Sequence, residues 1–428
     1  MPNTRECPAS HCPAYTPMPA TPALITQLTW RTLLLPLALV LFEFSTYIAN
    51  DMILPGMLAV THEFNAGPQW IPTSMTAYLV GGASLQWLLG PLSDRIGRRP
   101  VMLTGVMFFI CMCLLTLLTR TIEQFIMLRV FQGIGMCFIG AVGYALVQES
   151  FDEKTAIKVT ALMANVAMIA PLLGPLAGAI MIELAPWRMI FVLIAAVSFV
   201  SLIGLWFAMP KVLPVKADTP FTLTAVWQDY KKVFSNTHFL TGALAMGLCS
   251  VPLLTWIGIS PVILIKDAGL SPIEFGYWQM PVFGALIIGN FTLAKLSNYL
   301  PVRRMIGLGL IPQLFGLGFC FISMIIAPSH CISLVIGISF YAFGCGLVNA
   351  GLFRLVLFSS NVSKGTVAAA FGMITMGVYS LGIEGIKAGH LLAGNRFFAT
   401  ALLIVGGIFV MSLKRFMDKH QRIEALKA

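Results

Sequence analysis

Three ionisable residues lie inside long apolar stretches of this sequence, and their types suit the binding of protons and cations. Glu43 and Asp51 share one stretch, which contains FEFSTYIAND, and Arg129 lies in another. A charge in the hydrocarbon of a bilayer costs about 3 kcal/mol on insertion scales, so such residues are functional candidates by default. At 100° per residue the two acids are about 80° apart around a helix, with Tyr47 and Asn50 on the same side. We therefore expect one polar stripe that faces the inside of a helix bundle.

The depths of these charges indicate how they could work together. At 1.5 Å per residue, Glu43 lies about 15 Å from the inner end of its helix, Asp51 about 12 Å from the outer end, and Arg129 about 10 Å below the outer surface. Burial disfavours a charged carboxylate and a nearby guanidinium favours it, and this competition suits a proton switch. A substrate that altered the influence of Arg129 would change the proton affinity of either acid, and linkage makes this coupling reciprocal. The alternative is a buried network that only fixes helix packing.

Two further acids lie near the ends of apolar stretches. Glu384 is equally compatible with an interfacial position, and Glu149 falls at a cytoplasmic helix end, where we interpret it as structural. The histidines all fall in loops, tails or at the ends of spans, so general-base chemistry has no obvious centre. We therefore expect a transporter without catalytic residues, with the proton as coupling ion and no cofactor.

The elements that must position these charges are membrane-spanning helices. Of the 428 residues, 58% are hydrophobic and 10% are charged, which is too apolar for one soluble core. A spanning helix needs about 20 apolar residues, and we count twelve such stretches, separated by polar or Pro/Gly-containing turns. The expected helices are 33–59, 70–92, 101–119, 122–149, 157–182, 188–209, 239–265, 273–296, 304–327, 331–357, 365–388 and 396–413.

The basic residues fix the expected orientation and exclude other classes of protein. Most of the 27 Lys and Arg residues fall in loops on one side of the twelve helices. The other side has only Arg120, Arg188, Lys266, Lys387 and Arg396. The excess of positive charge places both termini in the cytoplasm. No segment between spans is large enough to be a nucleic-acid-binding domain, and Cys7, His11 and Cys12 match no standard zinc pattern.

The loops divide the chain into two halves. The longest expected loop, 210–238, separates a bundle over 31–209 from a second bundle over 239–415, with a disordered tail at 1–30 and a polar tail at 416–428. The run GPLSDRIGRR after the second helix is weakly repeated as AKLSNYLPVRR after the eighth. We therefore predict an all-α integral membrane protein built from two six-helix bundles.

Two motifs carry further information. In GPLSDRIGRRP, Gly90 and Gly97 allow tight turning and Asp94 can accept hydrogen bonds from a helix N-terminus or an arginine, while a generic basic loop would explain only the arginines. In APLLGPLAGA, prolines and glycines bend a helix and allow a neighbour to approach closely, although ordinary packing explains part of this pattern. These residues are Pro171, Gly174, Pro175 and Gly178.

With these motifs the sequence resembles the twelve-helix drug:proton antiporters of the major facilitator superfamily. RVFQGIG, from Arg129, resembles the family's motif in its fourth helix, and APLLGPLAGA resembles its antiporter motif, although Ala170 stands where the family usually has glycine. The resemblance implies that Glu43 and Asp51 alternate in binding proton and drug, with Arg129 as their basic partner. It also implies a gate and a substrate pocket. The gate residues are Gly90, Asp94, Arg95, Gly97 and Arg98, and the pocket residues are Tyr47, Asn50, Met75, Gln132 and Met163.

The expected protein is thus a monomeric, proton-driven exporter of lipophilic cationic or neutral compounds in the bacterial inner membrane. Its partners would be drug-like substrates, protons and membrane lipid, with no nucleic acid and no metal. Two alternatives stay open, namely a narrow-substrate metabolite exporter or symporter of the same fold, and a membrane-embedded enzyme.

Overall fold

The computed structural model describes residues 30–210, 223–297, 299–360, 362 and 364–425, and these residues are almost wholly helical. The predicted disordered tail, 1–30, lies outside the described residues except for Trp30, the first residue of α1. In the first half the helices are α1 (Trp30–Asp51), α2 (Met57–Glu63), α3 (Trp70–Ser84), α4 (Gln86–Ile96), α5 (Arg98–Leu115), α6 (Ile122–Phe138), α7 (Tyr144–Ser150), α8 (Glu153–Leu184) and α9 (Arg188–Ala208). The second half has α10 (Leu223–Ser235), α11 (Thr237–Ser260), α12 (Pro272–Leu296), α13 (Val302–Ile326), α14 (Ile332–Leu357) and α15 (Lys364–Ala425).

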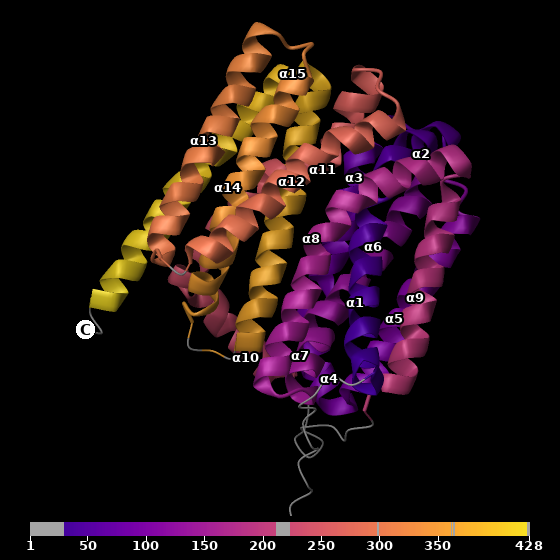
Figure 1. The fold of residues 1–428 in the computed structure, drawn as a ribbon, viewed down its shortest axis with the longest axis vertical. Helices are drawn as coiled ribbons and strands as arrows, with labels where there is room; N and C mark the ends of the chain where they lie inside the picture. The colour runs from indigo at the N-terminus through magenta and orange to yellow at the C-terminus, as the bar shows by residue number, and fades with distance from the viewer. Residues whose placement is uncertain (1–29, 211–222, 298, 361, 363, 426–428) are drawn as a thin grey trace, which may run out of the picture.

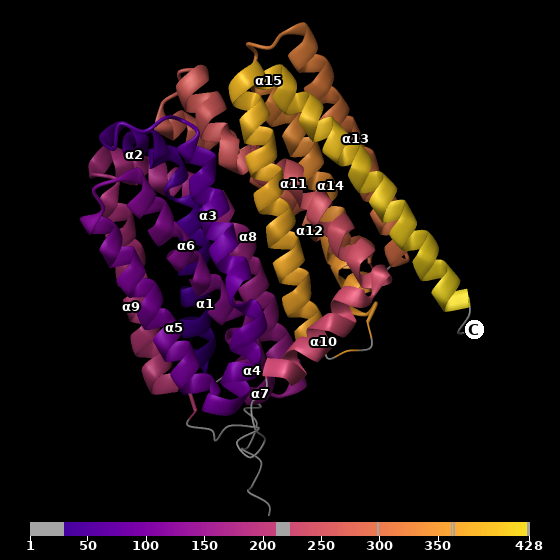
Figure 2. The same ribbon diagram turned by 180° about the vertical axis from the view of Figure 1, so that it is seen from behind.

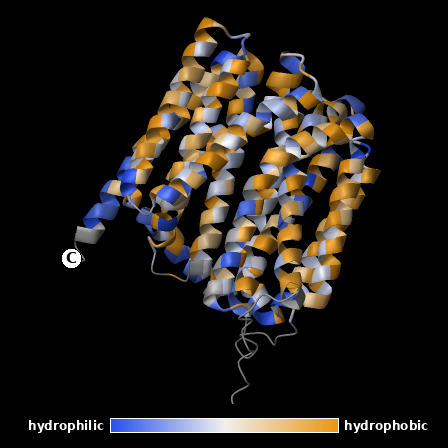
Figure 3. Ribbon diagram, in the orientation of Figure 1, coloured by the Kyte–Doolittle hydropathy of each residue, from blue (hydrophilic) through white to orange (hydrophobic). Residues whose placement is uncertain are grey.

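The helices form two bundles that lie side by side. Figures 1 and 2 show α1–α9 in one bundle and α11–α15 in the other, with α10 crossing the end that also carries α4 and α7. Each bundle has a hydrophobic core of its own, and α3 and α8 of the first bundle contact α11, α12 and α15 of the second. Figure 3 shows hydrophobic residues along the lengths of the helices. In the described part of the chain, nine helical segments are long and apolar enough to cross a membrane.

Several expected helices are interrupted, and each interruption has a local cause. The first ends at Asp51 and continues through a 3₁₀ turn, Leu54–Gly56, into α2. Pro55 explains this break, because its ring clashes with the carbonyl of the residue four positions earlier, which is Asp51. The second breaks at Leu85, where the Ser84 hydroxyl donates to the Gly81 carbonyl (2.6 Å), a bond that commonly bends helices. One expected pair, 365–388 and 396–413, is continuous as α15 except at Gly394, whose φ is 66°.

Two segments expected to lack helix are helical. Part of the predicted loop 210–238 is α10, whose Tyr230 and Val233 are buried on one face, and residues 211–222 of that loop lie outside the described residues. The helix α15 also continues beyond residue 413, with Phe416 fully buried against His238 (ring centroids 4.7 Å apart). Both segments place apolar residues three or four positions apart, which favours an amphipathic helix even where the composition is polar.

Candidate functional site

The acid Asp51 lies at the last position of α1, where Pro55 ends the helix. Its side chain is buried, and its Oδ1 accepts a hydrogen bond from Asn50 Nδ2 (3.0 Å). The glycines of α8 pack directly against this point: a Cβ on Gly174 would lie 2.8 Å from Asp51 Cβ. The acid is therefore held at a helix end by a neighbouring amide and a close helix contact.

The cation Arg129, on α6, is fully buried and binds neutral oxygens rather than a carboxylate. Its guanidinium donates to Ala49 O (3.0 Å), Ser74 Oγ (3.2 Å) and, more weakly, Asn50 Oδ1 (3.4 Å). It also donates to Gln132 Oε1 (2.9 Å), and it lies 4.5 Å from the centre of the Tyr78 ring. Since Asn50 also donates to Asp51, its amide bridges the cation and the acid. None of the ion pairs in the described part of the chain includes Arg129.

The second acid, Glu43, is fully buried two turns earlier on α1. Its Oε1 accepts from the Tyr144 hydroxyl (2.9 Å), and its Oε2 has no hydrogen-bond partner among the described residues. Tyr144 follows a π-helical segment, Ile139–Gly143, which shifts the register of the side chains that follow it. A buried carboxylate oxygen without a partner is costly and marks a position suited to a proton or to a cationic ligand.

The expected pocket residues fall into three groups. Gln132 and Met163 are fully buried inside the first bundle, and the Gln132 amide donates to Thr116 Oγ1 (2.8 Å) and Met112 O (3.2 Å), so both ends of its amide are engaged there. Met75 is also buried, but its sulfur is 3.4 Å from where a Cβ on Gly258 would lie, so it packs across the interface between the bundles. Tyr47 and Asn50 are partly exposed.

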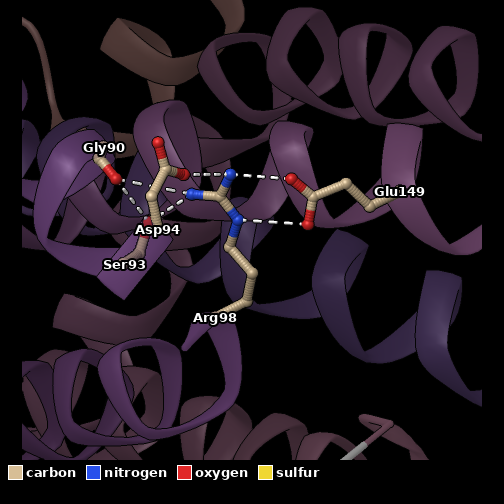
Figure 4. A network of polar contacts seen from close by, with 5 residues as sticks. All are labelled: Gly90, Ser93, Asp94, Arg98 and Glu149. Atoms are coloured by element: carbon tan, nitrogen blue, oxygen red, sulfur yellow. Dashed lines mark hydrogen bonds and ion pairs between the residues drawn. The ribbon is translucent and has the colours of Figure 1, made fainter. Parts of the chain in front are cut away.

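Three of the expected gate residues, Gly90, Asp94 and Arg98, cluster with Ser93 and Glu149 (Figure 4). The Arg98 guanidinium pairs with Asp94 Oδ1 (2.5 Å) and with both carboxylate oxygens of Glu149 (2.7 and 3.2 Å), and it also donates to the Ser93 hydroxyl. Arg98 therefore ties α4 to α7, and Glu149 takes part in this cluster rather than only ending a helix. The adjacent Arg95 is half-buried in the last turn of α4.

The two glycines of this motif differ in role. Gly97 forms the turn between α4 and α5 with φ 102°, a conformation that side chains disfavour, as expected from the sequence. The expectation for Gly90 was wrong, because α4 runs through this residue without a turn. Its contribution is its carbonyl, which accepts from the Ser93 hydroxyl (2.9 Å) and weakly from Arg98 (3.5 Å).

The PLLGPLAG segment of α8 packs against α1 at the acid. Pro171 and Pro175 are both accommodated within this helix. A Cβ on Gly178 would lie only 1.9 Å from the Met52 carbonyl oxygen. The small residues therefore set the distance between the two helices beside Asp51, as such residues do in membrane proteins generally.

Gly178→Ala is expected to force α8 away from α1 and to destabilise the protein by about 1–3 kcal/mol, the usual cost of overpacking a core. The same displacement is expected to impair transport, since it changes the packing of α8 against the end of α1, where Asp51 lies. Thermal unfolding of the purified protein, with transport in vesicles, measures both effects. The matched control is Gly377→Ala, where nothing lies within 4 Å of an added Cβ. Equal stability and activity of the two variants would contradict this account of the helix contact.

Comparison with known proteins is consistent with this arrangement. Residues 39–383 match the Major Facilitator Superfamily. This chain belongs to the Major Facilitator Superfamily. It is 55% identical over 394 residues to the multidrug transporter MdfA of Yersinia pestis bv. Antiqua (strain Angola), covering 91% of this chain and 96% of that one. It is also 54% identical to the multidrug transporter MdfA of Edwardsiella piscicida, covering 92% of this chain and 95% of the relative. The family resemblance expected from the motifs is thus confirmed.

Solved structures of the superfamily share the fold. A bacterial homolog of the human lysosomal transporter Spinster, crystallised in an inward-facing, unoccupied conformation, matches with a TM-score of 0.69 at 13% identity, over 92% of this chain and 98% of that chain. The human organic anion transporter MFSD10 matches with a TM-score of 0.63 at 15% identity, over 90% and 99% of the two chains. The major facilitator fold expected from the sequence is therefore confirmed.

Three residues that complete the site were not predicted from the sequence. Ser74 and Tyr78 contact Arg129, and Tyr144 contacts Glu43. Ser74 and Tyr78 are four residues apart, so they share one face of α3. For Ser74 and Tyr78, this spacing of polar groups inside an apolar stretch is the signal in the sequence that could have identified them.

Proposed function

We propose that this chain exports lipophilic cationic or neutral drugs from the bacterial cytoplasm in exchange for protons. It is a multi-pass membrane transporter of the major facilitator superfamily and not an enzyme. Support for the substrate class comes from the relatives, which are multidrug transporters at 54–55% identity over most of both chains. The observation that carries the exchange of protons for drugs is the pair of buried acids on α1, one with an unpartnered oxygen and one connected to Arg129 through Asn50.

The exchange follows from competition for these carboxylates. A proton neutralises a buried acid, and a cationic drug can neutralise it instead, so each disfavours binding of the other. A neutral drug would act through Arg129, whose partners Ser74 and Asn50 lie on two different helices. Movement of protons down their gradient then supplies the free energy, about 2.3 kcal/mol for each charge that crosses 100 mV.

We propose that the chain is a monomer in the inner membrane. It crosses this membrane twelve times, and both of its termini lie in the cytoplasm. The nine apolar segments become ten if α15 forms two spans separated at Gly394. The pair α3 and α4 forms one further span, and α8 forms another, which gives twelve. On this orientation Asp94, Arg98 and Glu149 lie at the inner end of the first bundle. We propose that this cluster is the inner gate, which rearranges as the two bundles rock in alternating access.

Transport into inside-out vesicles tests this function. With a pH gradient imposed, uptake of a lipophilic cation such as tetraphenylphosphonium is expected, and it should stop when an uncoupler is added. Vesicles lacking the protein provide the background. Uptake that persists in the presence of the uncoupler would reject proton coupling, and absence of uptake across a panel of lipophilic cations and neutral drugs would reject drug export.

A further inference from the structure

A polar contact joins the two bundles at the first turn of α3, which lies next to α2, the helix labelled near the top of Figure 1. Lys387 Nζ, on α15, donates to Thr73 Oγ1, on α3, at 2.8 Å. Lys387 also pairs with Glu384, one turn earlier on its own helix. The Lys387 side chain is only 13% exposed and that of Glu384 is 35% exposed, so the contact lies at the edge of the interface with Lys387 on its buried side.

The chemistry of this contact suits one that breaks and reforms. The Thr73 hydroxyl donates to Gln69 O (2.9 Å), so its lone pair is free to accept from Lys387. The partner that balances the charge of Lys387 is Glu384, which belongs to the same helix. If the bundles separated here, the ion pair would remain whole within α15 and only one hydrogen bond would be lost. An ion pair between the bundles would instead leave two uncompensated charges on separation, at a much larger cost.

The same turn of α3 is also in contact with the coupling site. Ser74, the residue after Thr73, accepts from Arg129 Nε (3.2 Å). Met75, the next residue, packs against Gly258 of α11. Three consecutive residues of α3 therefore contact, in order, α15 of the second bundle, the buried cation of the first, and α11 of the second. A displacement of Arg129 therefore moves Ser74. Because α3 is rigid, it also moves Thr73 and Met75, and so changes their contacts with the second bundle.

We propose that Lys387, Glu384 and Thr73 form an outer latch, which holds the outer ends of the two bundles together and opens when substrate binding displaces Arg129. Lys387 is then a positioning residue for the exchange and does not bind substrate. The assignment of this end as outer rests on the proposed function, whereas the latch itself does not depend on proton coupling.

Distances between the bundles test the latch directly. Spin labels at His62 and Ser329, exposed residues in the outer connections of the first and second bundles, would report opening in the full-length, purified protein with its native cysteines replaced. Thr73→Val and Lys387→Gln are each expected to raise the population with long distances, relative to the population with short distances, about tenfold. This is the effect of losing one hydrogen bond to a charged group. The double variant should change little beyond either single one, because both remove the same bond.

Conservative variants and controls separate a latch from general loss of packing. Thr73→Ser and Lys387→Arg keep the hydroxyl and the charge, and are expected to retain the short distances. Thr104→Val and Lys295→Gln make the same changes at exposed positions outside this contact, and should leave the distances unchanged. Unchanged distances in both Thr73→Val and Lys387→Gln would overturn the latch, as would equal shifts in the conservative and disruptive variants.

The connection through α3 has its own test. Tetraphenylphosphonium is expected to lengthen the distances in the unmodified chain, and Ser74→Ala should abolish this response. A full response in Ser74→Ala would overturn the connection. Failure of the latch and failure of the proposed function are distinguishable, because these distances are measured without a proton gradient, whereas proton coupling is judged by uncoupler-sensitive uptake in vesicles.

Discussion

Combined substitution of Glu43→Gln and Asp51→Asn is expected to abolish drug-stimulated proton release. Both replacements keep the size of the side chain, and each amide oxygen can still accept the bonds from Tyr144 and Asn50 that the carboxylates accept now. What is lost is the site that a proton or a cation neutralises. Since coupling between two ligands typically changes affinity about 5- to 150-fold, transport driven by that coupling should fall by a factor in this range.

The measurement is the pH change that follows addition of drug to the purified protein in weakly buffered detergent solution. Glu123→Gln is the matched control, because Glu123 is an exposed acid in the first turn of α6. The mechanism fails if the double variant releases protons as the unmodified chain does. Release that disappears in both the double variant and the control would point instead to loss of the folded state.

Arg129→Met is expected to cause both the largest loss of stability and a loss of transport. Methionine fills a similar volume but leaves the acceptors on Ala49, Ser74, Asn50 and Gln132 without their donor. Each buried acceptor left unsatisfied costs about 1–3 kcal/mol, and the interaction of the cation with the Tyr78 ring contributes about 2 kcal/mol when desolvated. These contributions are not additive, but each one alone is already a sizeable fraction of the free energy of unfolding of most proteins.

Thermal unfolding in detergent measures the first effect, and drug uptake into vesicles, scaled to the amount of folded protein, measures the second. Arg120→Met removes an exposed arginine from the connection just before α6, the helix that carries Arg129, and is expected to change neither. Equal stability of Arg129→Met and Arg120→Met would contradict the conclusion that the hydrogen bonds of Arg129 hold α1, α3 and α6 together.

The fold could be predicted from the sequence to a considerable extent, because the bilayer imposes strong local rules. Apolar length indicated where helices run, and Gly97 and Gly394 fall in two of the turns expected between them, although the break before Pro55 was not expected. The prediction failed at α10 and at the end of α15. There, polar composition suggested loop or tail, while burial of Tyr230 and Phe416 against neighbouring helices stabilises a helix. Such tertiary burial depends on residues distant in the chain and leaves no strong local signal.

Within the site, the residues on a single helix were the most predictable. Glu43 and Asp51 share α1, so their separation and common side followed from helical geometry. Arg129 was placed at a matching depth, yet the structure joins it to Asp51 through Asn50 rather than by an ion pair. This difference arises because depth constrains position along a helix but not rotation about its axis, and the rotation decides which atoms meet.

The sequence by itself determined the class of protein and the identity of its buried charges, because the cost of a charge in hydrocarbon depends chiefly on its depth in an apolar segment. The tertiary structure alone decided the partners: Tyr144 for Glu43, Ser74 for Arg129, and Thr73 for Lys387. Each of these contacts joins different helices, and the one between Lys387 and Thr73 joins the two bundles. Helix rotation, the π-helical segment before Tyr144 and the close approach of α8 to α1 together fix which side chains meet.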